Sequence, residues 1–235
     1  MEQLRLQSLQ AVVFDMDGLM FDSERYIQTA WNQAGTILGY GTLGDHIEKT
    51  LGFNGTKRRE FFLDLCGQDF PYDEFLELYR SLYFDRVRKE GIPAKEGLHE
   101  TLEILKELGI PMGVATSSSR ENTLKNLERE KITDYFETVI TGDMIRYGKP
   151  EPDIYLEACR QLKAEPRYAI ALEDAVNGIK AAAQAGMMPV MIPDLIKDTT
   201  QVDDLLFGKY RSLSEFAKEI RNSLGHPKGK EGEED

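Results

Sequence analysis

Two aspartates, Asp15 and Asp17, follow a short apolar run at residues 11–14 and come just before Gly18. A β-branched and aromatic run that ends in a glycine turn predicts a buried parallel strand with both carboxylates at its carboxyl end. Side chains at positions i and i+2 of an extended segment point the same way. One aspartate could therefore attack a phosphorus atom while the other transfers a proton. Taken alone, such a pair is more typical of a helix cap or of acids facing solvent.

Hydroxyl groups follow a second strand-like run, at residues 112–115. Thr116 and Ser117 come next, before a helical pattern that starts near Arg120. Hydroxyls and free backbone N–H groups at a helix start suit the oxygens of a phosphate. The alternative is that these residues only cap the helix.

Lys149 follows a third strand-like run, at residues 138–141, and is the residue before Pro150. Two prolines stiffen the backbone here, ahead of a helical pattern from Asp153 to Leu162. A lysine is a compact cation that suits a phosphate oxygen or a nucleophilic carboxylate. Without its neighbours, a single loop lysine would more often be solvated.

Glu173 and Asp174 follow a fourth apolar run, at residues 168–172, and precede an alanine-rich helical pattern that ends at Gly186. Carboxylate oxygens at a strand end are the ligands that Mg²⁺ prefers. The alternative is an acidic helix start that complements the helix dipole. Together the four segments outline a Mg²⁺-dependent aspartyl-phosphate site.

The elements that must position these groups alternate between strand and helix, which predicts an α/β protein with a Rossmann-like, doubly wound parallel sheet. Between the first strand and about Gly91 the pattern changes to amphipathic stretches at 26–38, 57–65 and 72–89, without strand signal. We therefore expect a core domain at residues 9–21 and 91–221, an inserted all-helical cap domain at 22–90, and a disordered tail at 222–235. A rigid helical layer that completes the core is the alternative to a cap.

The four segments together resemble the haloacid dehalogenase superfamily, and within it the phosphatases and phosphomutases similar to β-phosphoglucomutase. The resemblance spans about residues 11–192. It rests on motifs in the superfamily's order, namely Asp-x-Asp-Gly, Ala-Thr-Ser-Ser, Gly-Lys-Pro-x-Pro-Asp and Leu-Glu-Asp-x-x-x-Gly-Ile.

The resemblance implies a role for each motif. Asp15 would be the nucleophile that forms an acyl phosphate, and Asp17 the acid and base that protonates the leaving alcohol and then activates water. Thr116 and Ser117 would bind the transferring phosphoryl group. Lys149 would stabilise charge on that group and keep Asp15 ionised.

The resemblance also implies a Mg²⁺ cofactor. Glu173 and Asp174 would hold it together with the Asp15 carboxylate and the Asp17 backbone carbonyl. A phosphoryl-transfer transition state needs positioning and charge neutralisation, which a metal ion and one lysine supply.

Substrate specificity is expected in the helical insert, where the stretch at residues 52–59 resembles the substrate loop of related caps. Gly52 and Lys57 are candidates there, although a solvated helix start explains Lys57 at least as well. Trp31, the single tryptophan, falls where related caps have an aromatic residue that faces the cleft, and a core role fits it about equally.

Composition restricts the partners. A net charge of −12 argues against nucleic-acid binding, and no run approaches the ~18 apolar residues of a membrane span. Met1–Gln10 lacks the basic and apolar blocks of a signal peptide, and only Cys66 and Cys159 are present, so we expect a cytoplasmic protein without disulfides. A monomer is the default expectation, because no heptad pattern occurs.

The sequence favours a phosphatase that acts on a small phosphorylated metabolite, such as a sugar phosphate. β-Phosphoglucomutases carry a cap histidine where this chain has Ile27, which weakens the mutase alternative. The segment at residues 21–24 instead resembles small-sugar-phosphate phosphatases. A mutase, or a pseudo-enzyme that only binds metabolites or protein partners, remains open.

Overall fold

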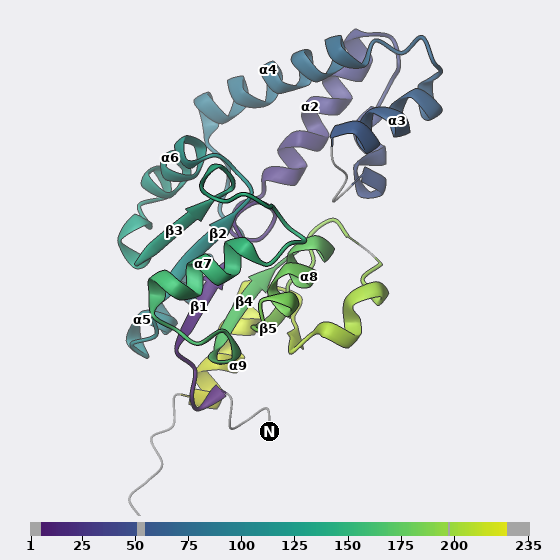
Figure 1. Ribbon diagram of the computed structural model, residues 1–235. Coiled ribbons are helices and arrows are strands. Elements are labelled where there is room, and N and C mark those ends of the chain that lie inside the picture. The colour runs from purple at the N-terminus through teal and green to yellow at the C-terminus, as the bar shows by residue number, and fades with distance from the viewer. Residues whose placement is uncertain (1–5, 51–54, 197, 225–235) are drawn as a thin grey trace, which may run out of the picture.

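The computed structural model describes residues 6–50, 55–196 and 198–224. Its core is a six-stranded parallel sheet with the strand order β3-β2-β1-β4-β5-β6 (Figure 1). The strands are β1 (Ala11–Phe14), β2 (Met112–Thr116), β3 (Thr138–Thr141), β4 (Ala169–Glu173), β5 (Met188–Met191) and β6 (Gly208–Lys209). Because β1 lies between β2 and β4 in the sheet, the residues after these three strands meet at one edge.

Helices surround the sheet, and a separate group of helices is formed by the part of the chain that connects β1 to β2 (Figure 1). The helices of the insert are α2 (Ser23–Ile37), α3 (Gly55–Cys66) and α4 (Tyr72–Glu90), with a 3₁₀ segment η1 (Leu43–Thr50). The core helices are α5 (Leu98–Glu107), α6 (Arg120–Glu130), α7 (Asp153–Leu162), α8 (Val176–Gln184) and α9 (Leu213–Leu224). Short 3₁₀ segments connect them, namely η2 (Thr133–Tyr135), η3 (Gly142–Met144), η4 (Pro166–Tyr168) and η5 (Thr200–Leu205).

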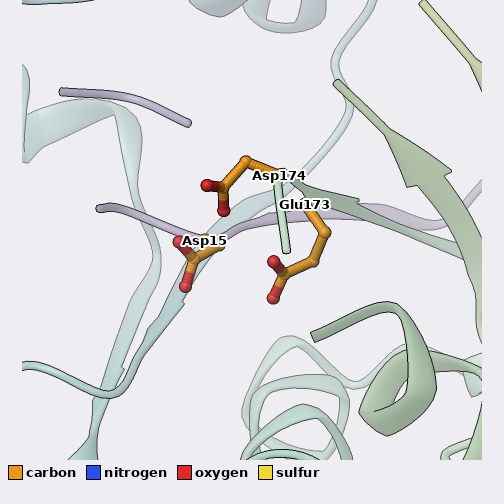
Figure 2. Close-up of side chains that lie close together, drawn as sticks. All are labelled: Asp15, Glu173 and Asp174. Carbon is orange, nitrogen blue, oxygen red and sulfur yellow. The ribbon is translucent and has the colours of Figure 1, made fainter. Parts of the chain in front are cut away.

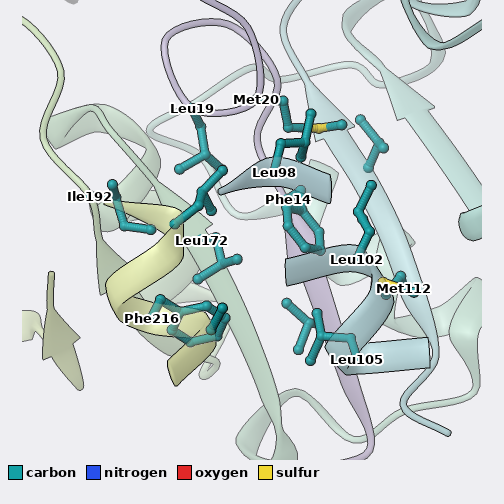
Figure 3. Close-up of a cluster of buried hydrophobic side chains, with 14 of the residues drawn as sticks. Phe14, Leu19, Met20, Leu98, Leu102, Leu105, Met112, Leu172, Ile192 and Phe216 are labelled. Carbon is teal, nitrogen blue, oxygen red and sulfur yellow. The ribbon is translucent and has the colours of Figure 1, made fainter. Parts of the chain in front are cut away.

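The two faces of the sheet carry side chains of different size. Successive residues of a strand point to opposite faces, so Val12 and Phe14 pack with α5 and α9, while Ala11 and Val13 pack with α7 and α8. Large side chains fill the first face, as Figure 3 shows around Phe14. Small residues dominate the second face, which lets α7 and α8 lie close behind the residues at the strand ends.

Two adjacent chain segments join the insert to the core. The backbone N–H of Asp22 donates to the carbonyl of Pro93 at 2.9 Å, and that of Lys95 donates to the carbonyl of Met20 at 2.8 Å. The carboxylate of Asp194, which follows β5, is paired with Lys95 at 2.5 Å and with Arg25 at 2.9 Å. Both connections are therefore anchored to the core at one place.

An aromatic cluster forms the interior of the insert. Trp31 contacts the rings of Phe62, Phe75 and Tyr79 edge-on at centroid distances of 5.0–6.0 Å. These side chains are buried, and they form a hydrophobic core separate from the two clusters that flank the sheet.

The expected fold class is confirmed: the sheet is parallel and the segment between β1 and β2 is helical. The expected helical stretches match α2, α3 and α4 to within three residues at each end. The last helix, α9, extends to Leu224, so the first three residues of the expected tail are helical. Within the described ranges, the helices are too short or too polar to cross a membrane.

Candidate active site

Lys149 lies at the centre of a buried group of charges at the carboxyl edge of the sheet. Its ammonium donates to Asp15 Oδ1 at 2.5 Å, to Glu173 Oε1 at 2.7 Å and to the backbone carbonyl of Ala115 at 2.9 Å. An ammonium group has three donors, and these three acceptors come from the ends of β1, β4 and β2. The lysine is therefore held in one orientation by three neighbouring strands.

Glu173 Oε1 also accepts a hydrogen bond from the hydroxyl of Tyr155 on α7, at 2.5 Å. The Lys149 Nζ lies 5.0 Å from the centre of the Tyr155 ring. Glu173 is 1% exposed and Tyr155 is fully buried. Burial, together with the Glu173 carboxylate, raises the pKa of Tyr155 well above its usual value, so its hydroxyl stays a donor.

Two glycines make room for the carboxylates. A Cβ on Gly178 would lie 1.8 Å from Glu173 Oε1, and a Cβ on Gly18 would lie 2.2 Å from Asp174 Oδ2. Gly18 also has a φ of +84°, a conformation that favours glycine. Both residues must be glycines for Glu173 and Asp174 to approach Asp15.

Asp17 is fixed from the end of β2. Its Oδ2 accepts from the Ser118 hydroxyl at 2.6 Å, and the Thr116 hydroxyl lies 3.4 Å from the same oxygen. Thr116 Oγ1 in turn accepts from the backbone N–H of Ser118 at 3.1 Å. Ser119 caps α6. The capping alternative therefore holds for Ser119, while phosphate binding by Thr116 and Ser117 stays a prediction.

The acidic residues fit a divalent cation. Ligand atoms of Asp15, Glu173 and Asp174 lie within 4.8 Å of one another, and Figure 2 shows the three carboxylates converging. Lys149 balances one of their three negative charges, and hard carboxylate oxygens are the donors that Mg²⁺ prefers. The charge and the donor type both suit Mg²⁺.

The pKa values of the cluster reflect this excess of negative charge. Burial raises the pKa of Asp15 to about 8; Lys149 opposes the rise, and the carboxylates of Glu173 and Asp17 add to it. Burial, together with the charges of Asp15 and Glu173, raises the pKa of Asp174 well above its usual value. Although burial disfavours its ammonium, Asp15 and Glu173 raise the pKa of Lys149. A second cation in the cluster would lower the pKa of both aspartates.

These residues line a cavity of about 370 Å³. Its wall includes Asp15, Asp17, Thr116, Ser117, Lys149, Glu173 and Asp174, so the structure brings together all seven residues expected from the four motifs. Two residues of the insert, Glu24 and Arg58, also line it. Burial, together with the charge of Asp17, raises the pKa of Glu24 to about 7.

An outer cavity of about 570 Å³ lies between the insert and the core, and it shares Asp17, Glu24, Arg58 and Ser117 with the first cavity. The insert side combines apolar and aromatic side chains with the charged Arg80, besides Glu24 and Arg58; the apolar and aromatic ones are Ile27, Tyr79, Tyr83, Phe84 and Val87. The side formed by α6 and the residues before it is polar, with Ser117, Ser118, Asn122, Lys125 and Asn126. A molecule bound here would contact hydroxyl, amide and ammonium groups on one side and aromatic rings on the other.

Of the residues expected from the insert, Arg58 of the stretch at 52–59 lines both cavities, whereas Trp31 and Lys57 line neither. Trp31 is 1% exposed and lies in the aromatic core of the insert, so the core alternative holds and the expected contact with the cleft is wrong. Lys57 is exposed on α3 and is not part of either cavity wall. Gly52 lies outside the described residues.

Several residues of the site were not singled out from the sequence. Ser118 belongs to the expected hydroxyl run, yet its contact with Asp17 depends on the pairing of β1 with β2. Tyr155 lies two residues into α7, where a helical pattern indicates only a buried position. Glu24, at the start of α2, lines both cavities.

Comparison with known proteins gives consistent matches. The family model of haloacid dehalogenase-like hydrolases matches residues 12–192. The chain is 30% identical over 189 residues to hexitol phosphatase B of Escherichia coli (strain K12), which covers 78% of this chain and 83% of the relative. It is 31% identical over 191 residues to β-phosphoglucomutase of Bacillus subtilis (strain 168), which covers 77% and 82%.

A solved structure has the same fold. It is a HAD family hydrolase of Deinococcus radiodurans R1 with bound phosphate and sodium. It superimposes with a TM-score of 0.80 at 22% identity, covering 92% of this chain and 97% of the other. The chain belongs to the haloacid dehalogenase-like hydrolases, as the motifs predicted.

Proposed function

We propose that this protein is a Mg²⁺-dependent phosphatase that hydrolyses a small phosphorylated metabolite through an aspartyl phosphate on Asp15. The observation that supports it most is the contact of Lys149 with Asp15 and Glu173, in a cavity that also contains Asp17 and Asp174. A nucleophilic carboxylate, a cation and a second carboxylate for proton transfer are the groups that this reaction needs.

In the first step, a carboxylate oxygen of Asp15 forms a bond to phosphorus while the bond from phosphorus to the leaving oxygen breaks. Asp17 gives its proton to that oxygen. In the second step, Asp17 takes a proton from water as the water oxygen attacks the phosphorus atom, which releases phosphate and restores the Asp15 carboxylate. The Ser118 hydroxyl orients Asp17 for both transfers, because it donates to Asp17 Oδ2 at 2.6 Å.

Mg²⁺, when bound, would neutralise charge on the phosphoryl oxygens. Asp15, Glu173 and Asp174 would hold it with their carboxylates, and Asp17 with its backbone carbonyl. Lys149 contributes the second positive charge from the protein itself, and Thr116 and Ser117 provide donors for the phosphoryl oxygens.

The leaving group would occupy the outer cavity. Hydroxyl and amide groups on one wall and aromatic rings on the other suit a sugar or polyol, which presents both hydroxyls and C–H faces. In this proposal residues 22–90 act as a cap that opens for the substrate and closes over it to exclude water. The 30% identity to hexitol phosphatase B is consistent with this substrate class.

A phosphosugar mutase is the second candidate, and the 31% identity to β-phosphoglucomutase favours it. Such an enzyme would return the phosphoryl group to another hydroxyl of the sugar instead of passing it to water. Ile27 lines the outer cavity where the mutases have a histidine, and its side chain cannot transfer a proton. The phosphatase therefore fits this chain better.

The test is phosphate release from a panel of phosphorylated sugars, polyols, glycolate and nucleotides, in Mg²⁺ and in EDTA, with sugar isomers followed in parallel. We expect metal-dependent release that is lost in Asp15→Asn. Isomer exchange without release would favour the mutase. No reaction with any substrate would favour a protein that only binds metabolites.

A further inference from the structure

Tyr155 is a buried polar residue beside the proposed reaction centre that has no part in the chemistry described so far. Its side chain belongs to the cluster of α7, α8 and one face of the sheet, which is otherwise built from aliphatic side chains, a methionine and a cysteine. A phenylalanine would satisfy that packing. A buried hydroxyl, by contrast, is unfavourable unless it is hydrogen-bonded, and this one donates to Glu173 Oε1 at 2.5 Å.

The hydroxyl of Tyr155 contacts Glu173 and its ring contacts Lys149, and these two residues connect it to the proposed nucleophile. The hydroxyl shares Glu173 Oε1 with the Lys149 ammonium, and the ring centre lies 5.0 Å from Lys149 Nζ, within the range of a cation–π contact. Lys149 in turn donates to Asp15 Oδ1. A chain of contacts therefore runs from α7 through Glu173 and Lys149 to Asp15.

The second oxygen of Glu173 is weakly fixed. Glu173 Oε2 accepts from the backbone N–H of Ala175 at 3.4 Å, at the long end of hydrogen-bond distances. The orientation of Glu173 therefore depends mainly on the two donors at Oε1, one of which is Tyr155.

We propose that Tyr155 is a positioning residue: its hydroxyl fixes the Glu173 carboxylate so that Lys149 stays directed at Asp15 and Glu173 stays directed at the metal site. This inference rests on the phosphatase function proposed above. In this proposal Tyr155 does not contact the substrate. Removing the hydroxyl should therefore slow turnover and weaken metal binding without a comparable effect on substrate binding.

The test is Tyr155→Phe, which removes only the hydroxyl, measured beside Tyr135→Phe as a matched control. Tyr135 also donates from its hydroxyl to a glutamate, Glu103, but at an exposed site away from both cavities. We expect Tyr155→Phe to lower kcat about 10- to 100-fold, the usual effect of losing a group that orients a metal ligand, with little change in KM. Tyr135→Phe should keep the wild-type kcat.

A second readout does not depend on turnover. Mg²⁺ that binds the folded state raises its unfolding temperature once its concentration exceeds the Kd, and the Mg²⁺ concentration at which the rise begins should increase about 10-fold or more in Tyr155→Phe. A tyrosine that only packs the core would lower the unfolding temperature without moving this concentration. Unchanged kcat and unchanged Mg²⁺ dependence would overturn the inference.

A double variant tests whether Tyr155 acts through Glu173. Because Tyr155 acts through the Glu173 carboxylate, its removal should cost less in a Glu173→Gln background than in the wild type, and fully additive losses would count against the inference. The wild-type assay separates the two proposals. An inactive wild type refutes the phosphatase, whereas an active wild type with a fully active Tyr155→Phe refutes only the role of Tyr155.

Discussion

Replacing Glu24 by glutamine should make the stability of the protein less sensitive to pH. Glu24 is part-buried on α2 and lines both cavities. Burial raises its pKa from 4.5 to about 7, and the charges of Asp17 and Asp194 add to the rise, while Arg58 and Lys95 oppose it. Glutamine has nearly the same shape and cannot ionise, so it removes this titration while keeping the packing.

The direction of the pH effect follows from whether the folded or the unfolded state holds the proton on Glu24. Between pH 4.5 and about 7 the folded protein keeps a proton on Glu24 that the unfolded chain has released, so stability falls as pH rises through this range. At about 1.4 kcal/mol per pKa unit, the cost above pH 7 is on the order of 3 kcal/mol. Glu24→Gln should be more stable than the wild type by about this amount at pH 8.

The assay is thermal unfolding by circular dichroism at pH 4.5 and pH 8, in EDTA so that no metal binds nearby. For a chain of this size the difference corresponds to a rise of roughly 6–12 °C at pH 8, shrinking towards zero at pH 4.5. Glu121→Gln is the control, because Lys125 lowers the pKa of that exposed carboxylate and no rise at pH 8 is expected. An unfolding temperature for Glu24→Gln at or below that of the wild type at pH 8 would refute the reasoning.

Three further predictions follow from contacts in the site and the insert. Gly178→Ala should displace the Glu173 carboxylate, because the new Cβ would lie 1.8 Å from it, and should lower Mg²⁺-dependent activity about 10- to 100-fold; Gly148→Ala, with open space around its Cβ, should be near wild type. Asp194→Asn, which weakens the two ion pairs at the insert connections, should cost about 2 kcal/mol of unfolding free energy in a urea titration. Trp31→Ala should cost about 3–5 kcal/mol in the same titration, and a smaller loss would argue against its place in the insert core.

The sheet could be predicted to a large extent because its strands are buried on both faces. The runs at residues 11–14 and 112–116 are almost wholly apolar, a pattern that few other elements share. β6, at Gly208–Lys209, has two residues, and no periodicity can be recognised over that length. The hydrophobic pattern does not determine the order of the strands in the sheet either, because that order depends on how the connecting helices pack.

The site could be predicted where chemistry and strand ends coincide. Asp15 directly follows an apolar run, Glu173 ends one, and Lys149 lies in the loop after a third. Parallel strands bring the loops after their carboxyl ends to one edge. Tyr155 lies inside a helical pattern and Glu24 just before one. There the sequence shows which positions are apolar but not which neighbour a polar atom meets. Trp31 illustrates the same limit, because an aromatic residue of an amphipathic helix fits a cleft or a core equally well before the packing of α3 and α4 is known.

The central claim is that the phosphoryl group passes through Asp15, and trapping that intermediate tests it most directly. Asp17→Asn should slow hydrolysis of the acyl phosphate, while nitrophenyl phosphate still reacts because its leaving group needs no proton. After an acid quench and borohydride reduction, which converts an acyl phosphate to an alcohol, peptide mass spectrometry should find a substrate-dependent modification at Asp15. Absence of that modification while the same variant turns over, or its presence at another residue, would contradict the account.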